Sequence, residues 1–102
     1  MLFSIIIPAF NAERYLHDSL KSIRMQTFTD YETIIVDDGS TDKTGEIADS
    51  FAGETSRTHV IHQENEGLLL ARRTGLQAAS GKYVVFLDAD DSLRSTALQD
   101  IA

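Results

Sequence analysis

The stretch Tyr83-Val84-Val85-Phe86-Leu87-Asp88-Ala89-Asp90-Asp91 decides the fold class, because an apolar run ends there in a cluster of acids. A short, valine-rich apolar run is typical of a buried strand in a parallel sheet. Gly81 stands just before the run and separates it from a segment with helical spacing. We therefore predict a strand followed by an acidic turn at its carboxyl end.

Three more pairs of strand and helix precede this stretch. We expect strands at residues 4–7, 31–36 and 58–62, helices at 12–26, 41–53 and 68–78, and the start of a last helix at 95–102. Pro8 is expected to end the first strand, because proline lacks the N–H of a sheet ladder, and Asn11 can cap the helix after it. Leu16, Leu20 and Ile23 fall at i, i+4 and i+7, on one face of that helix. The 68–78 helix has small residues on its inner face, including Ala71 and Gly75, and small residues let a helix lie close to a sheet. The alternation predicts right-handed βαβ units in an α/β fold: a mainly parallel, Rossmann-like sheet of about four strands with helices on both faces.

Composition limits the possible functions. The chain has 102 residues, a net charge of −7 and no cysteine, so we expect one domain without disulfides or thiolate metal sites. The longest apolar run has five residues, far below the ~20 needed to span a bilayer. No basic residues precede the apolar start, so we expect no signal peptide. The acidic balance argues against nucleic acid as a partner.

The acids are unevenly placed. Three windows, Asp37–Asp42, Glu64–Glu66 and Asp88–Asp91, hold eight of the 16 acids. Each window follows a predicted strand, and ligands of open parallel sheets bind beyond the carboxyl ends of the strands. Clustered carboxylates repel one another unless solvent or a cation separates them. The sequence therefore predicts an acidic rim that binds a divalent cation and whatever that cation bridges.

Two windows carry specific hypotheses beside plainer alternatives. In Asp88-x-Asp90, one carboxylate can hold Mg²⁺ or Mn²⁺ directly while the other acts through water or a ribose hydroxyl. The alternative is a solvated turn that caps the next segment. In Asp37–Asp42, a carboxylate can accept the N–H of a pyrimidine base, or the acids simply form a turn.

The basic and imidazole side chains are open to similar pairs of interpretations. Arg72 either reaches the rim, to meet a phosphate or balance its acids, or belongs with Arg73 to a solvated face. His59 and His62 are three residues apart on a strand, so they point to opposite faces and are expected to be ordinary histidines. Neither a P-loop motif nor a G-x-G-x-x-G motif is present.

Five motifs occur together in one order. They are Ser4–Asn11, Ser22–Phe28 with its Gln26-Thr27, Ile35–Asp42, Asn65–Arg72, and Gly81–Asp91. In this order and spacing the chain resembles the N-terminal half of the family-2 glycosyltransferases, which have the GT-A fold. The resemblance covers essentially all 102 residues.

The resemblance implies roles for individual residues. Pro8 and Ala9 would line a base pocket through their backbone, and Asp38 would accept the N–H of uracil or another base. Asp88 would lie near the ribose or a metal-bound water. Asp90 would bind Mn²⁺ or Mg²⁺, which bridges the donor diphosphate. Arg72 would hold the nucleotide at the rim.

The resemblance also implies an activity. Similar enzymes transfer a sugar from a nucleotide donor such as a UDP-sugar to an acceptor hydroxyl, with inversion, in polysaccharide biosynthesis. The metal stabilises the departing diphosphate and a carboxylate base deprotonates the acceptor. The chain ends eleven residues after Asp91, so we expect this base and the acceptor site downstream of Ala102. Arg73 departs from the family, in which many members have asparagine.

Residues 1–102 are therefore expected to form the nucleotide-sugar-binding part of a GT-A domain, cut short at its C-terminal end. The expected partners are a nucleotide-diphospho-sugar and, through the missing region, a glycan or lipid-linked glycan acceptor. Uncovered apolar surface near the last strand predicts self-association. The expected location is cytoplasmic, or peripheral at the inner face of a membrane in the full-length protein.

Two other classes of protein compete with this interpretation. One is a stand-alone nucleotide- and metal-binding module without catalysis, which the length of the parent reading frame would distinguish. The other is a phosphoacceptor receiver domain. Receivers carry an acidic pair after the first strand, where this chain has Pro8-Ala9-Phe10-Asn11.

Overall fold

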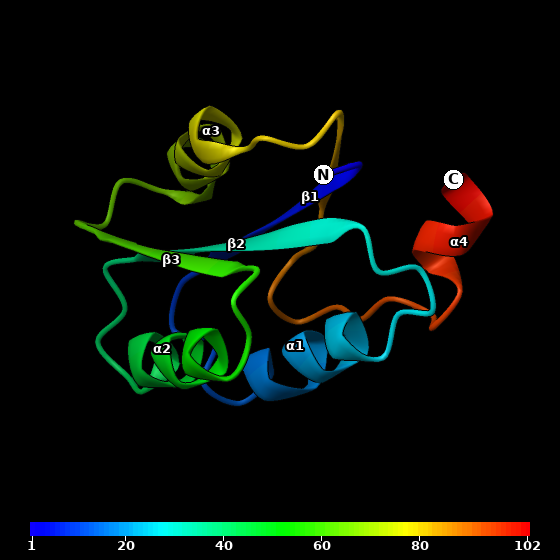
Figure 1. Cartoon of the computed structure of the whole chain (residues 1–102). Coiled ribbons are helices and arrows are strands. Elements are labelled where there is room, and N and C mark those ends of the chain that lie inside the picture. Colours follow the sequence, from blue (N-terminus) through cyan, green and yellow to red (C-terminus); the bar gives the residue numbers. More distant parts are fainter.

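Strands and helices alternate along the whole chain, which the computed structural model describes from residue 1 to residue 102 (Figure 1). The elements are β1 (Phe3–Ala9), α1 (Leu16–Arg24), β2 (Tyr31–Asp38), α2 (Thr44–Glu54), β3 (Thr58–Gln63), α3 (Leu68–Ala78), β4 (Tyr83–Phe86) and α4 (Ala97–Ile101). The predicted alternation is confirmed, with every expected element present.

The four strands form one parallel sheet in the order β3-β2-β1-β4. Ile5 of β1 lies between Thr33 of β2 and Val85 of β4. Helices α1 and α2 cover one face of the sheet and α3 covers the other (Figure 1). The predicted Rossmann-like α/β architecture with helices on both faces is therefore confirmed.

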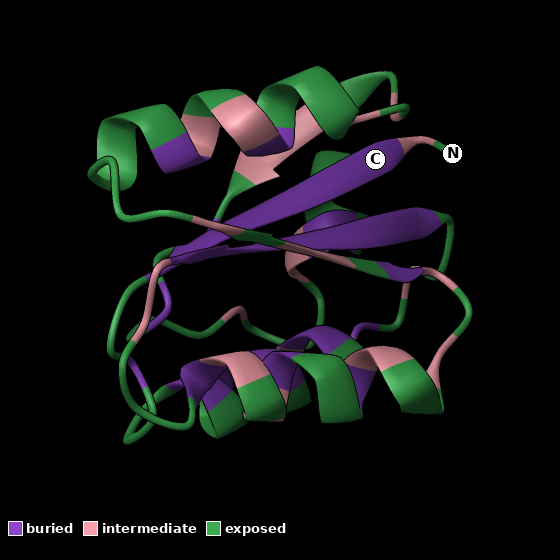
Figure 2. Cartoon of the chain, turned by 90° about the vertical axis from the view of Figure 1, so that its left-hand side faces the viewer, coloured by how far each residue is buried: buried purple, intermediate pink, exposed green.

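The two central strands form the centre of the core. Every residue of β1 and β2 is buried, whereas the outer strands β3 and β4 are largely half-buried or exposed (Figure 2). The larger apolar cluster joins the sheet to α1, through Leu16, Leu20 and Ile23, and to α2. These three residues are the i, i+4, i+7 positions that predicted the helix.

Helix α3 lies close to the sheet. Its inward residues are Ala71 and Gly75, both buried. A Cβ atom at Gly75 would lie 2.4 Å from Cγ2 of Ile6 and 3.4 Å from Cγ2 of Val36. Small residues are therefore required here, as the sequence predicted.

Pro8 does not end β1 as expected, because the strand continues to Ala9 and Pro8 pairs with Val36 of β2. The reason is the direction of the missing N–H. The carbonyl of Ile6 accepts the Leu87 N–H on the β4 side, and alternate residues of a strand face the same neighbour. Position 8 therefore faces the side where β4 has already ended at Phe86.

Asn11 also differs from its expected role as the cap of α1. It adopts a left-handed backbone with φ of 48°, a conformation that asparagine tolerates better than most residues. Its Oδ1 accepts the Thr41 N–H at 2.8 Å, and its own N–H donates to Ser40 Oγ at 3.0 Å. Asn11 thus ties the loop after β1 to the loop after β2.

None of the helices has the combination of length and apolar character that crossing a membrane requires. The edge strand β4 exposes two aromatic side chains, with Tyr83 52% and Phe86 48% accessible. This is the uncovered apolar surface expected near the last strand. Self-association through it stays a prediction.

Candidate functional site

A pocket of about 330 Å³ lies at the carboxyl ends of β1 and β4. These strands are neighbours although they are the first and last in the chain, and their helices α1 and α3 lie on opposite faces. Such a switch point is where open α/β sheets bind ligands. The pocket is lined by Pro8, Phe10, Asn11, Ala12, Tyr15, Leu68, Arg72, Asp88, Ala89 and Asp90.

Three carboxylates lie close together after β4, and two of them, Asp88 and Asp90, line the pocket. Asp88, Asp90 and Asp91 are exposed and can each offer an oxygen within 4.8 Å of the others. The chain turns here, with the Asp91 N–H donating to the Asp88 carbonyl at 2.9 Å, while Leu87 and Ala89 are buried. We name residues 88–91 the acidic turn. Asp91 was noted in the sequence as one of the clustered acids but was assigned no role.

Arg72 lies at the same rim. Its Nη2 is 3.0 Å from Oδ1 of Asp88. Arg72 therefore reaches the end of β4 from its position about one turn into α3. Arg72 is half-buried whereas Arg73 is exposed. The Arg72–Asp88 ion pair balances one negative charge of the acidic turn and places a guanidinium beside the pocket.

The strand β1 supplies the opposite wall. Pro8 lines the pocket, whereas Ala9 is fully buried and does not line it. Two aromatic rings that sequence reasoning missed, Phe10 and Tyr15, line the pocket with 43% and 50% of their surface exposed. An aromatic residue directly after a strand, on the rim where ligands bind, was the signal that could have identified Phe10.

Asp38 is placed differently from the expectation of a carboxylate free to meet a base. It is fully buried and does not line the pocket. Its Oδ1 accepts Gln63 Nε2 at 3.0 Å and the Glu66 N–H at 2.9 Å, and its Oδ2 accepts the Gly67 N–H at 2.9 Å. Burial opposes ionisation of Asp38, but these three hydrogen bonds outweigh it and lower its pKa. Because Asp38 has no exposed surface, a base N–H could reach its carboxylate only if the surrounding residues moved.

Asp37 belongs to a separate network with His62. Nδ1 of His62 is 2.8 Å from Oδ2 of Asp37, and its Nε2 is 2.8 Å from Oδ1 of Asp49. Hydrogen bonds from His62 to the carboxylates of Asp37, first, and Asp49 favour the protonated imidazole and raise the pKa of His62. His59 instead faces Glu32, 3.8 Å away. His59 and His62 thus have different carboxylate partners.

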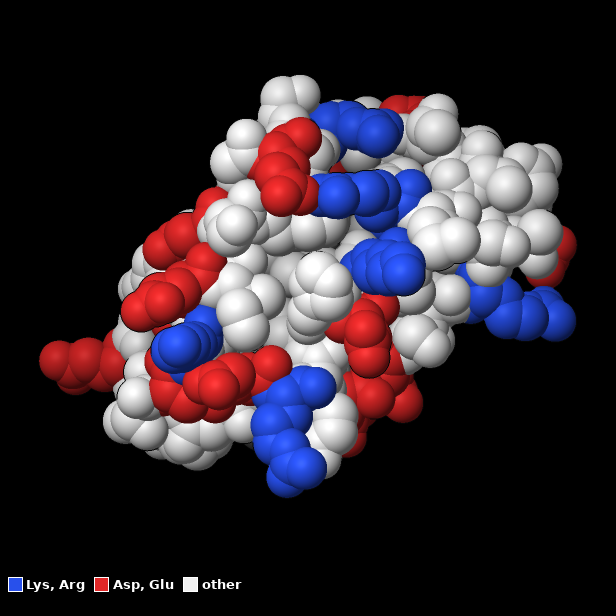
Figure 3. All heavy atoms as spheres, turned by 90° about the horizontal axis from the view of Figure 1, so that it is seen from below, with Lys and Arg blue, Asp and Glu red and all other residues white.

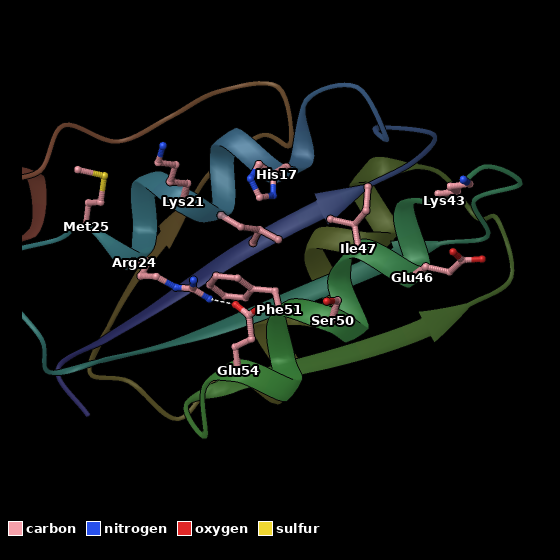
Figure 4. Close-up of a pocket in the computed structure, with 11 residues that line it drawn as sticks. His17, Lys21, Arg24, Met25, Lys43, Glu46, Ile47, Ser50, Phe51 and Glu54 are labelled. Carbon is pink, nitrogen blue, oxygen red and sulfur yellow. Dashed lines mark hydrogen bonds and ion pairs between the residues drawn. The ribbon is translucent and has the colours of Figure 1, made fainter.

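A larger groove, of about 610 Å³, lies between α1 and α2. Ile47 and Phe51 point into it, and the Arg24–Glu54 ion pair spans it (Figure 4). Basic side chains gather across the middle of this face of the molecule and acidic side chains lie around them (Figure 3). No residue predicted from the sequence to bind nucleotide or metal lines this groove.

Comparison with known proteins places these observations in a family. The family model described as glycosyl transferase family 2 matches residues 4–102. Glycosyltransferase EpsJ of Bacillus subtilis is 45% identical over 98 residues, which are 96% of this chain and 28% of EpsJ. TarS 1–349 of Staphylococcus aureus, in complex with UDP, superposes with a TM-score of 0.92 and 34% identity over 99% of this chain and 31% of that one.

A second solved structure carries both a nucleotide sugar and a metal. The mannosyltransferase PcManGT of Pyrobaculum calidifontis, in complex with GDP-Man and Mn²⁺, superposes with a TM-score of 0.82 at 27% identity, over 88% of this chain and 28% of that one. The chain thus spans less than a third of the length of each of these relatives. Because the family model covers nearly the whole chain and the fold is shared, this chain belongs to glycosyl transferase family 2.

Proposed function

We propose that these 102 residues bind the nucleotide-diphospho-sugar donor of an inverting, metal-dependent glycosyltransferase. The complete protein would transfer the sugar to an acceptor hydroxyl. The observation that carries the proposal is the acidic turn, with three carboxylates within 4.8 Å beside a pocket at the switch point of the sheet. The relatives with UDP and with GDP-Man and Mn²⁺ support the same ligand class.

The acidic turn fits a hard divalent cation, because carboxylate oxygens are the ligands that Mg²⁺ and Mn²⁺ prefer. We propose Asp90 as the direct ligand and Asp88 as a ligand through water or the partner of a ribose hydroxyl. Asp91 supplies a third carboxylate within reach of both. When bound, the cation would supply electrostatic stabilisation of the departing diphosphate.

The remaining pocket residues would bind and orient the nucleotide. Phe10 and Tyr15 offer exposed rings against which a base can stack, and Pro8 forms part of the same wall. Ala9 is fully buried, so it would support this wall from within rather than contact the base. Arg72 places its positively charged guanidinium beside the pocket, and this group can exchange its partner Asp88 for a phosphate oxygen. Asp38 would support the pocket without contacting the nucleotide. It holds the backbone of Glu66 and Gly67, the two residues before the start of α3.

The acceptor site and the general base are proposed to lie in sequence outside residues 1–102. This proposal is supported by the lengths of the relatives, because the chain spans only 28% of EpsJ and 31% of TarS 1–349. No acid of the described residues is therefore given the role of the base.

Calorimetry with UDP tests the donor site. We expect UDP to bind in the presence of Mn²⁺ and much more weakly without it. Asp90→Ala should abolish the dependence on Mn²⁺, whereas Asp18→Ala, which removes an exposed acid on α1, should preserve it. If the folded protein binds UDP neither with nor without Mn²⁺, the site assignment is refuted.

A further inference from the structure

One face of α1 carries polar side chains that the donor site leaves without a role. Ser19 and Ser22 are three residues apart and lie on the same side of the helix, and Gln26 follows just beyond its C-terminal end. Two of them belong to the Ser22–Phe28 motif that contributed to the family resemblance. All three contact the segment that follows β4, which runs alongside α1 (Figure 1).

Ser19 contacts the acidic turn itself. The side chain is buried, with 1% of its surface exposed. Its Oγ lies 2.7 Å from the carbonyl oxygen of Ala89 and is also hydrogen bonded to the carbonyl oxygen of Asp91. These two carbonyls stand on either side of Asp90. A hydroxyl has one proton to donate, so Ser19 shares it between the two carbonyls and contacts the backbone on both sides of the proposed metal ligand.

Ser22 and Gln26 hold the continuation of the same segment. Ser22 Oγ accepts the Leu93 N–H at 3.0 Å. Gln26 is buried, and its Nε2 donates to the Arg94 carbonyl at 2.6 Å while its Oε1 accepts the Leu98 N–H at 3.2 Å. The three side chains thus hold the main chain at successive points after the acidic turn.

The segment needs such contacts because it has no regular structure of its own. Between the end of β4 at Phe86 and the start of α4 at Ala97 there is neither strand nor helix. Asp88 is held by its ion pair with Arg72 of α3, whereas the carboxylates of Asp90 and Asp91 are exposed and do not anchor the segment. On the inner side, Ser19 supplies a buried hydrogen bond to the Ala89 carbonyl, and Ser22 supplies a half-buried acceptor for the Leu93 N–H.

We propose that Ser19 is a positioning residue for the acidic turn, and that Ser22 extends the same support. Ser19 orients the carboxylates of Asp90 and Asp91 through the main chain and thereby raises the affinity for the divalent cation. This inference rests on the proposed function, since it takes the acidic turn to be the metal site. Groups that hold metal ligands in place typically contribute about 10–100-fold in metal affinity.

Titration with Mn²⁺ in the presence of UDP, with free Mn²⁺ measured by electron paramagnetic resonance, tests the proposal. We expect Ser19→Ala to weaken Mn²⁺ binding about tenfold or more. The matched control is Ser4→Ala, which also removes a buried hydroxyl with two partners. Ser4 donates to Glu32 at 2.6 Å and accepts the Gly81 N–H at 2.7 Å, before the start of β4 rather than after its end.

Thermal unfolding of the same variants separates positioning from stability. Both Ser→Ala variants should unfold at a lower temperature than the parent chain, but only Ser19→Ala should bind Mn²⁺ more weakly. Equal Mn²⁺ affinity in the parent chain and a folded Ser19→Ala overturns the proposal, as does equal weakening in Ser4→Ala. If the parent chain itself binds no Mn²⁺, the proposed function has failed instead.

Ser22→Ala provides a second test if Ser19→Ala does not fold. Ser22 is only half-buried and contacts Leu93, two residues beyond Asp91, so the variant should fold. We expect Mn²⁺ binding to weaken in the same direction, by a smaller factor than for Ser19→Ala. Unchanged Mn²⁺ affinity in Ser22→Ala, with Ser19→Ala unfolded, counts as refutation.

Discussion

Replacing Asp38 by asparagine should destabilise the fold by an amount that its contacts determine. The Asp38 carboxylate is fully buried and accepts three hydrogen bonds, two at Oδ1 and one at Oδ2. Asparagine has a single acceptor oxygen. With that oxygen in place of Oδ1, the amide nitrogen would face the Gly67 N–H, so two donors would oppose each other without an acceptor.

The magnitude follows from this geometry. A hydrogen bond to a charged group contributes ~1.5–3 kcal/mol, and a buried donor left without a partner costs ~1–3 kcal/mol. The two bonds that survive at Oδ1 become bonds to a neutral acceptor and weaken. Taking these contributions as overlapping, we expect Asp38→Asn to lower the free energy of unfolding by about 2–4 kcal/mol at neutral pH.

Urea unfolding followed by circular dichroism measures this loss, with Asp30→Asn as the control that removes an exposed acid. The pH dependence gives a second readout. Because the folded pKa of Asp38 lies below its ordinary value of 3.8, its stabilisation is present above that value and is lost as pH falls through the folded pKa. The difference in the free energy of unfolding between the parent chain and Asp38→Asn should therefore shrink as the pH is lowered.

Two results would refute this reasoning. One is a loss below about 0.5 kcal/mol at neutral pH, the size expected for an ordinary surface substitution. The other is a difference that grows as the pH is lowered. If Asp38→Asn instead keeps its stability but loses affinity for UDP, the carboxylate contacts the base, as the family resemblance implied.

Three further predictions concern the rest of the molecule. Gly75→Ala should lower the thermal midpoint, because overpacking against Ile6 costs ~1–3 kcal/mol and exceeds the ~1 kcal/mol gain in helix propensity; an unchanged or raised midpoint would contradict this. Because the pKa of His62 is raised in the folded protein, its stabilisation of the fold is complete below its ordinary pKa of 6.5. This stabilisation is lost as the pH rises through the pKa of the folded state. His62→Gln should therefore reduce stability in acidic buffer and much less in alkaline buffer, and an equal loss in both, measured by urea unfolding, would disprove it. We expect sedimentation to show self-association that Phe86→Lys reduces, since a charge on an edge strand opposes pairing; a monomer at every concentration would exclude it.

Local patterns were sufficient for most of the fold. The i, i+4, i+7 spacing of Leu16, Leu20 and Ile23 predicted the buried face of α1 because amphipathic periodicity reflects burial directly. The small residues Ala71 and Gly75 predicted the close approach of α3 in the same way. The role of Pro8 could not be predicted from local pattern, because it depends on where β4 ends, almost eighty residues later.

The candidate site was predictable in part. The acidic turn and Arg72 were identified because residue type and strand order place them at one rim. The hydrogen bonds of Asp38 to Glu66 and Gly67 depend on the conformation of a loop, which no periodic pattern encodes. The contacts of Ser19 were likewise out of reach, because a serine within a helix gives no sign of which distant carbonyl it meets.

The position of β4 at the edge of the sheet has a consequence for the order in which the protein assembles. Strands β1, β2 and β3 are consecutive in the chain and adjacent in the sheet, so they can pair as they leave the ribosome. Strand β4 must return across the opposite face to join β1, and only four residues hold it there. The acidic turn is therefore completed only after β1, β2 and β3 have been synthesised, and we expect partial opening of the folded protein to release it before the central strands.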